Sequence, residues 1–197
     1  MNTTQLRRST TKLCLTICTI LALVVVPNTP AISQSSGGES ESGGGEMEVT
    51  ATATGGLTNA RTAAITLKMS ATIDECRLIP EEYRADCLAQ NLREASKIVK
   101  NNGYRKLNAE ISSAAQQISS IVAQNIDTSA PKLRLGKKTY RAVKKSALSA
   151  VNKKAAAVVA ETSTVLLRST GSSALKKVHF TRIAKAVNST KVLLRSA

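Results

Sequence analysis

The chain of 197 residues carries a formal net charge of +15, since 28 Lys and Arg residues face only 13 Asp and Glu residues. Its length suits one domain with a tail. Hydrophobic residues make up 42% of the chain and aromatic residues 2%, so a core must be built from Ala, Val, Ile and Leu. This composition argues against a wide β-sandwich, which normally needs aromatic and β-branched fillers, and favours helices packed closely together.

The N-terminus has the layout of an export signal. A segment with three basic residues precedes the apolar residues 13–26, and the small residues Ala31 and Ser33 favour cleavage before Gln34. The alternative is an uncleaved anchor, but the apolar stretch would span about 21 Å as a helix, less than the roughly 30 Å of a bilayer core. We therefore predict that residues 1–33 form a signal peptide and that the mature chain is periplasmic or extracellular.

Residues 34–56 are dominated by Gly, Ser, Glu and Thr and contain few apolar side chains. Such a segment cannot bury enough surface to offset the entropy lost on ordering. We predict a disordered acidic tail here, followed by a helical domain over residues 57–197.

Loss of the signal peptide would leave two cysteines, Cys76 and Cys87. A pair in an exported protein predicts a disulfide, and the spacing of eleven fits neither a C-x-x-C redox motif nor a zinc site. In one unbroken helix these residues would lie about 16 Å apart, whereas a disulfide needs Cα atoms about 4.4–6.8 Å apart. The chain must therefore turn between them, and Pro80 is the expected place.

The predicted helices follow from apolar residues that recur every three or four positions. The first covers residues 57–78, and the second starts at Pro80 and stops near Gly103. For these two we expect buried stripes at Leu57, Ala60, Ala64, Leu67 and Ala71, and at Tyr83, Cys87, Asn91 or Leu92, Ala95 and Ile98 or Val99. The third covers residues 104–126, with a heptad-like stripe at Leu107, Ile111, Ala114, Ile118, Ile121 and Asn125.

The C-terminal half predicts two more helices. Residues 137–169 contain no Gly or Pro and predict one helix about 50 Å long. Ser172 or Ser173 could cap a last helix, whose buried stripe would be Phe180, Ile183, Val187, Thr190 and Leu194. A six-residue string at 164–169 recurs in similar form at 191–196, which leaves a short duplication open.

The predicted fold is therefore all-α, an antiparallel bundle of four to five helices with long C-terminal helices. Self-association along these helices, as in a coiled coil, is a further expectation. A near-neutral half, residues 57–127, would carry the disulfide corner, and residues 128–197 would form a strongly basic half.

Charge is the strongest functional signal, because residues 128–197 hold sixteen basic residues and a single acidic one, Glu161. Such a surface attracts polyanions whatever their sequence. The candidate partners are an anionic membrane, an envelope glycan or an acidic protein, with nucleic acid less favoured because no aromatic stacking platform is present. A merely solvated basic face is the alternative. The candidate polyanion-binding residues are Lys137, Lys138, Arg141, Lys144, Lys145, Lys153, Lys154, Lys176 and Lys177.

The sequence offers no constellation of nucleophile, base and charge-stabilising group. Its single histidine, His179, stands alone and is expected at the surface or at the edge of the core. The carboxylates around the cysteines alternate with arginines, which favours salt bridges over acid–base chemistry. We expect no cofactor, no metal and no small-molecule substrate, and we predict a non-enzymatic envelope protein with a structural or interaction role. Nucleic-acid binding and an enzyme of unrecognised type are the alternatives.

Overall fold

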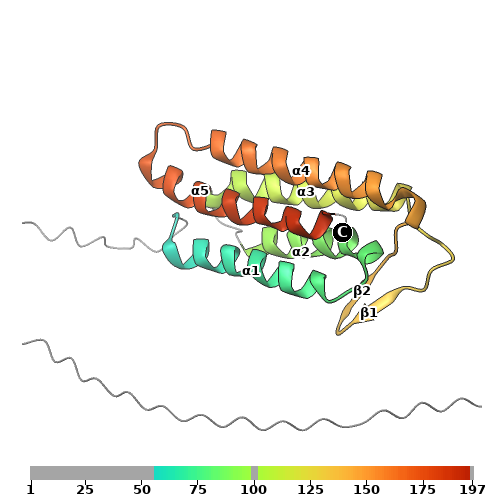
Figure 1. Ribbon diagram of the computed structural model, residues 1–197. Helices are drawn as coiled ribbons and strands as arrows, with labels where there is room; N and C mark the ends of the chain where they lie inside the picture. Colours follow the sequence, from blue (N-terminus) through green and yellow to red (C-terminus); the bar gives the residue numbers. More distant parts are fainter. Residues whose placement is uncertain (1–55, 99–101, 196–197) are drawn as a thin grey trace, which may run out of the picture. The chain divides into compact units, whose positions relative to one another are not determined.

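The computed structural model describes residues 56–98 and 102–195, which belong to one compact unit (Figure 1). The predicted signal peptide lies outside the described residues, and so does the predicted tail apart from Gly56. The described chain is mostly helical, with five α-helices and one small sheet of two strands. The helical fold class is confirmed, and the sheet is an addition to it.

Helices α1 (Asn59–Arg77) and α2 (Glu81–Ile98) agree closely with the first two predicted helices. The hydroxyl of Thr58 caps α1 by accepting a hydrogen bond from the backbone N–H of Arg61 at 3.3 Å. The chain turns at residues 78–80, and α2 begins directly after Pro80 with Glu81 and Glu82 in its first turn. Negative charge there is stabilised by the positive end of the helix dipole.

The buried face of α1 is not the predicted one. The helix buries Thr62, Ile65, Met69, Thr72 and Cys76, whereas Ala60, Ala64 and Ala71 are exposed and Leu67 is 71% exposed. Both sets have helical spacing, so periodicity alone could not choose between them. The face carrying the larger side chains, Ile65 and Met69, and the disulfide cysteine packs into the core.

Helix α3 (Arg105–Gln124) follows a short 3-10 turn, η1 (Asn102–Tyr104). Its predicted stripe is confirmed at Leu107, Ile111, Ala114 and Ile118, all fully buried. The stripe then shifts from Ile121 to Val122, because a helix of 3.6 residues per turn drifts relative to a seven-residue repeat.

The single long helix predicted over residues 137–169 is wrong in its first eleven residues. These residues form strand β2 (Lys138–Tyr140), an extended segment and a 3-10 turn, η2 (Lys145–Ala147), before α4 (Leu148–Arg168) begins. Strand β1 (Leu133–Leu135) pairs antiparallel with β2, with Leu133 opposite Tyr140. Gly136, with φ of 57°, opens the two-residue turn between them, a position that favours glycine.

Helix α5 (Ala174–Ser189) has the predicted cap, since the hydroxyl of Ser173 accepts from the N–H of Lys176 at 3.3 Å. A 3-10 helix, η3 (Thr190–Leu194), continues the chain. The predicted stripe of this region is confirmed, because every member is buried: Phe180, Ile183, Val187, Thr190 and Leu194. The described parts of the repeated six-residue string take two structures, since residues 164–168 end α4 and residues 191–194 lie in η3, so they do not mark a structural repeat.

Each α-helix packs against the next along the chain, and α5 also packs against α1, so the helices enclose a common core (Figure 1). The 3-10 helix η3 contacts α1, α2 and α4. The core is built almost wholly of aliphatic side chains, with Tyr104, Tyr140 and Phe180 as its fully buried rings. The antiparallel arrangement of the bundle stays a prediction.

Candidate functional site

The nine candidate polyanion-binding residues do not form one surface. Seven of them are exposed, namely Lys137, Lys144, Lys145, Lys153, Lys154, Lys176 and Lys177. Helix α4 separates them into two groups: five lie on the hairpin or at the start of α4, and two lie at the start of α5, beyond the other end of α4 (Figure 1). Lys154 lies 14 positions before Arg168, the last residue of α4, so about 20 Å of helix separates the two groups at their nearest members.

We call the larger group, together with two further exposed cations of the hairpin region, the hairpin-end surface. It consists of Lys132, Arg134, Lys137, Lys144, Lys145, Lys153 and Lys154. Three partly buried carboxylates, those of Glu81, Glu82 and Asp127, lie at the same end of the fold. The side chain and backbone of Ser129 donate hydrogen bonds to Asp127, which hold the pKa of that carboxyl below its ordinary value. The cations still outnumber these carboxylates by more than two to one.

Arg141, another of the nine candidates, forms an ion pair with Asp86 inside the fold. Its Nε and Nη2 atoms donate to Oδ1 of Asp86 at 3.0 and 2.5 Å, and its backbone N–H donates to Oδ2 at 3.0 Å. Asp86 is fully buried on α2, and Gln90 also donates to it, at 2.9 Å. Removing a charge from water is costly unless it is paired and hydrogen-bonded, and this carboxylate is both.

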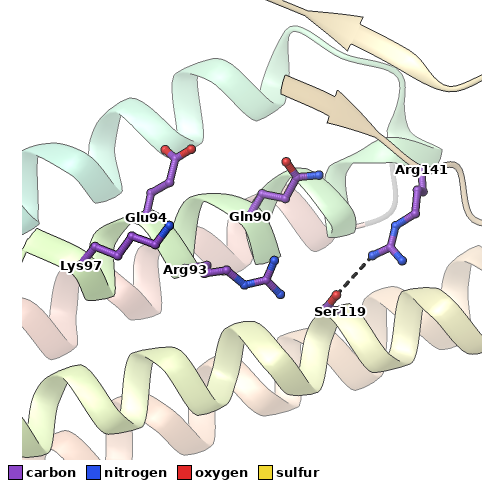
Figure 2. A pocket seen from close by; sticks show the side chains of 6 residues that line it. All are labelled: Gln90, Arg93, Glu94, Lys97, Ser119 and Arg141. Carbon is purple, nitrogen blue, oxygen red and sulfur yellow. Dashed lines mark hydrogen bonds between the residues drawn. The ribbon is translucent and has the colours of Figure 1, made fainter. Parts of the chain in front are cut away.

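An open cleft of about 430 Å³ lies beside this ion pair (Figure 2). Helix α2 contributes most of its lining, α3 contributes Ser119, and the segment after β2 contributes Arg141. The residues on α2 are spaced at three and four, so they share one helical face: Gln90, Arg93, Glu94 and Lys97. The spacing was visible in the sequence, but only the fold places Ser119 and Arg141 opposite this face.

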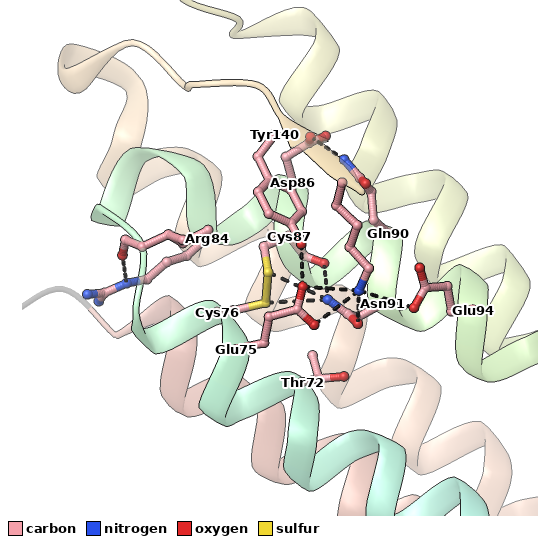
Figure 3. The surroundings of a disulfide bond; sticks show 12 residues. Thr72, Glu75, Cys76, Arg84, Asp86, Cys87, Gln90, Asn91, Glu94 and Tyr140 are labelled. Atoms are coloured by element: carbon pink, nitrogen blue, oxygen red, sulfur yellow. Dashed lines mark hydrogen bonds and ion pairs between the residues drawn. A yellow bond between two sulfur atoms is a disulfide. The ribbon is translucent and has the colours of Figure 1, made fainter. Parts of the chain in front are cut away.

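A charged network that includes Glu75, Asn91 and Glu94 lies next to the disulfide (Figure 3). Lys138, the other candidate that is used inside the fold, belongs to this network. Its ammonium group donates to both carboxylate oxygens of Glu75 at 3.0 Å and to Oδ1 of Asn91 at 2.9 Å. Lys68 of α1 donates to the same Asn91 oxygen at 2.7 Å and pairs with Glu94 at 2.7 Å. The network thus joins α1, α2 and β2.

The electrostatics of this network favour ionised carboxylates. Burial alone would raise the pKa of Glu75, but the hydrogen bonds from Tyr140 and Lys138, together with the charges of Lys138 and Lys68, hold the pKa below its ordinary value. Burial would likewise raise the pKa of Glu94, but the hydrogen bonds and the positive charges of Lys68 and Lys138 together lower it. Burial and the hydrogen bond to Glu75 raise the pKa of Tyr140 far above its ordinary value, so its hydroxyl stays protonated and donates.

The disulfide between Cys76 and Cys87 joins α1 to α2, as predicted from the turn at Pro80. The Cα atoms are 5.8 Å apart. The amide of Asn91 points at both sulfur atoms, with Nδ2 at 3.7 Å from Cys76 Sγ and 3.6 Å from Cys87 Sγ. Asn91 therefore links the bridge to the ion pairs, a role that its place one helical turn after Cys87 allows.

His179 is buried, rather than at the surface or at the edge of the core. Its Nδ1 atom is hydrogen-bonded to the hydroxyl of Thr62 at 2.8 Å, and that hydroxyl is hydrogen-bonded to Tyr104 at 3.0 Å. Burial, together with the charge of Arg182, holds the pKa of His179 below its ordinary value. The side chains of Thr62, Tyr104 and His179 are buried and join α1, η1 and α5 inside the core.

Within residues 56–98 and 102–195 no cluster of His, Cys, Asp and Glu side chains has the composition to hold a metal ion. None of the helices described is long and apolar enough to cross a bilayer. Comparison of the chain with protein-family models, with curated proteins and with solved structures finds no match.

Proposed function

We propose that this chain is an exported, non-enzymatic protein of the cell envelope, which uses the hairpin-end surface of an antiparallel helical bundle to bind anionic membrane surfaces. The observation that carries the proposal is the concentration of seven exposed cations on one end of the fold, in a half of the chain with a single acidic residue. Clustered cations raise the local concentration of polyanions, and each juxtamembrane Lys or Arg contributes about 1 kcal/mol at an anionic bilayer.

The fold supports a surface role for these lysines. Lys138 pairs with Glu75 of α1 and Arg141 pairs with Asp86 of α2, so the two residues hold this segment against both helices. The neighbouring cations Lys137, Lys144 and Lys145 remain exposed. A signal peptide would bring the surface to the side of the membrane where the disulfide is stable.

The test is co-sedimentation of residues 34–197, the disulfide-bonded chain without the predicted signal peptide, with vesicles of neutral lipid and with vesicles containing anionic lipid, across a salt series. We expect binding to the anionic vesicles alone, with affinity falling as salt screens the surface charges. Duplex DNA added as a competitor separates the membrane proposal from nucleic-acid binding, which would show a steeper salt dependence and displacement by DNA.

Two variants of equal charge make the test specific to one surface. The first replaces Lys144, Lys145, Lys153 and Lys154 with Gln, and the matched control replaces Lys176, Lys177, Arg182 and Lys185 of α5, all of which are exposed. We expect the first to lose most vesicle binding and the control to keep it. Equal losses in both would show that net charge alone, rather than the hairpin-end surface, drives the interaction.

Export and signal-peptide cleavage are tested by measuring the mass of the exported protein. The mass of the protein recovered from outside the cytoplasm should correspond to a chain that begins at Gln34 and lacks two hydrogens from the Cys76–Cys87 bond. A recovered chain that retains residues 1–33 would contradict cleavage.

A further inference from the structure

The cleft between α2, α3 and the segment after β2 has the size of a ligand site but little apolar lining. Its volume of about 430 Å³ lies in the range of small-molecule pockets, roughly 300–1,000 Å³. The six lining side chains are all polar or charged: Gln90, Arg93, Glu94, Lys97, Ser119 and Arg141. The cleft therefore suits a polar ligand, and none of the seven cations of the hairpin-end surface lines it.

The two cations on α2 are available to a ligand. Arg93 and Lys97 are exposed, and neither forms an ion pair with another residue in the described part of the chain. The carboxylate of Glu94 lies between them in sequence but is held by Lys68 at 2.7 Å and by Lys138 at 3.2 Å. Glu94 thus leaves the positive charge of Arg93 and Lys97 uncompensated.

The opposite wall of the cleft is held in place. The guanidinium of Arg141 is fixed by Asp86 and also donates from Nη2 to the hydroxyl of Ser119 at 3.2 Å. Figure 2 shows the guanidinium groups of Arg93 and Arg141 extending toward the space above Ser119 from two sides. A guanidinium that is already oriented loses less side-chain entropy when it binds an anion than a free one does.

We propose that this cleft is a binding site for a phosphate, sulfate or carboxylate group carried by a small polar molecule. The planar fork of Arg93 matches such an oxyanion with two parallel N–H donors, and Lys97 adds a mobile positive charge. Arg141 presents its remaining donors from the rigid wall. The side chains of Gln90 and Ser119 supply amide and hydroxyl groups for the uncharged part of the ligand, such as sugar hydroxyls.

The test is a titration of the full-length, ¹⁵N-labelled, disulfide-bonded protein with inorganic phosphate, inorganic sulfate and glucuronate, each at constant ionic strength set with sodium chloride. We expect at least one of these anions to produce saturable shifts of the Arg93 Nε–H signal and of the Ser119 amide. The three arms distinguish phosphate, sulfate and carboxylate as the preferred group.

Arg93→Gln removes the fork while keeping an exposed polar side chain, and we expect it to weaken binding about tenfold or more, since a hydrogen bond to a charged group contributes about 1.5–3 kcal/mol. Lys97→Gln should weaken binding less. The matched control is Lys153→Gln, which removes one charge outside the cleft and should leave the affinity unchanged. An amide spectrum otherwise identical to that of the wild type shows that each variant is folded.

Shifts that grow linearly without saturation, or an affinity that Arg93→Gln leaves unchanged, would overturn the proposal. Because these probes are small and no vesicle or polymer is present, the result is independent of the vesicle experiment. A protein could fail either test and pass the other.

Discussion

Asp86 is a fully buried carboxylate whose ion pair fixes one end of the fold. Four hydrogen bonds reach its two oxygens, three of them from Arg141 and one from Gln90. Its neighbour Asn91, also fully buried, accepts from Lys68 and Lys138 and donates to the carbonyl oxygen of Cys87 at 3.1 Å. At the scale of single residues, these two buried polar side chains are stabilised because their donors and acceptors are matched.

Asp86→Ala should cost about 3 kcal/mol of unfolding free energy, because it leaves the partly buried guanidinium of Arg141 without its counter-charge. Urea denaturation measures the loss. The control, Asp74→Ala, removes an exposed carboxylate from α1 and should change the stability by no more than about 0.5 kcal/mol. Equal effects of the two substitutions would show that the ion pair is not a significant source of stability.

His179 gives the stability a dependence on pH near neutrality. Because folding lowers its pKa below the ordinary value of 6.5, the unfolded chain takes up the proton first as the pH falls. The contribution of His179 to the unfolding free energy is therefore complete above pH 6.5, and it is lost as the pH drops from there toward the pKa of His179 in the folded protein. His179→Gln can retain a hydrogen bond to Thr62 but does not titrate, so its unfolding free energy should be flatter across this window. Urea midpoints measured from about pH 8 to about pH 5 test this, and parallel curves would refute it.

The hairpin was the element hardest to predict from the sequence, because long-range contacts with the charged network hold it in place. Its strands have three residues each, too few for independent stability, so contacts with α1 and α2 must hold it. Gln90 donates to the carbonyl oxygen of Thr139, and Tyr140 and Lys138 bond to Glu75. These partners lie 47 or more residues away in sequence, so local periodicity could not reveal them.

The same reasoning explains which elements could be predicted. Helices α2, α3 and α5 have one apolar face each and a Pro, Gly or Ser at an end, so periodicity and capping located them. Residues 137–147 carry Tyr140 and Val143 at helical spacing by coincidence, and tertiary pairing overrides that pattern. The exposed lysines of the candidate site could be predicted from the charge of the sequence alone. The cleft could not, because it forms only when packing brings Ser119 and Arg141 opposite α2.

Tyr140→Phe tests how firmly the hairpin is held. The change removes the hydrogen bond to the Glu75 carboxylate and should cost about 2 kcal/mol, since bonds to charged groups contribute about 1.5–3 kcal/mol. The matched control Tyr83→Phe removes a neutral bond, donated to the carbonyl oxygen of Pro131 at 2.7 Å, and should cost about 1 kcal/mol. In the first variant the pKa of Glu75, followed by NMR, should also rise. A larger loss for Tyr83→Phe than for Tyr140→Phe would contradict the greater strength expected of the hydrogen bond to Glu75.

The disulfide stabilises the pairing of α1 and α2. Cys76→Ser with Cys87→Ser should lower the unfolding free energy by about 3 kcal/mol, since the bond closes a loop of eleven residues' separation. Thermal and urea denaturation, compared with the oxidised wild type, measure the effect. Digestion without reductant should yield one linked peptide pair, and two free thiols would contradict the bridge.

On the scale of the whole molecule, the C-terminal 3-10 helix completes the core. Thr190, Leu193 and Leu194 of η3 are buried where this segment contacts α1, α2 and α4. Helix α5 also packs against α1, so the last residues of the chain hold the first helix of the described fold. The core therefore depends on contacts between the two ends of the described chain.

Leu193→Ala should be strongly destabilising, by about 2–5 kcal/mol, because Leu193 is 1% exposed and its loss leaves a cavity between three helices. Leu167 of the similar string in α4 corresponds to Leu194 rather than to Leu193, and it is 44% exposed, so it serves as an exposed leucine for comparison. Leu167→Ala should therefore cost less than about 1 kcal/mol. Urea denaturation compares the two, and similar losses would contradict the central position of η3.

The position of η3 has a consequence for how the protein is made. A ribosome releases the chain from its N-terminus, so α1, α2 and α3 emerge long before residues 190–194. Until that last segment is synthesised, α1 lacks both α5 and η3, and Ile65 and Met69 have no complete core to enter. We therefore expect the described fold to close only late in synthesis, once α5 and η3 are both free to pack against α1.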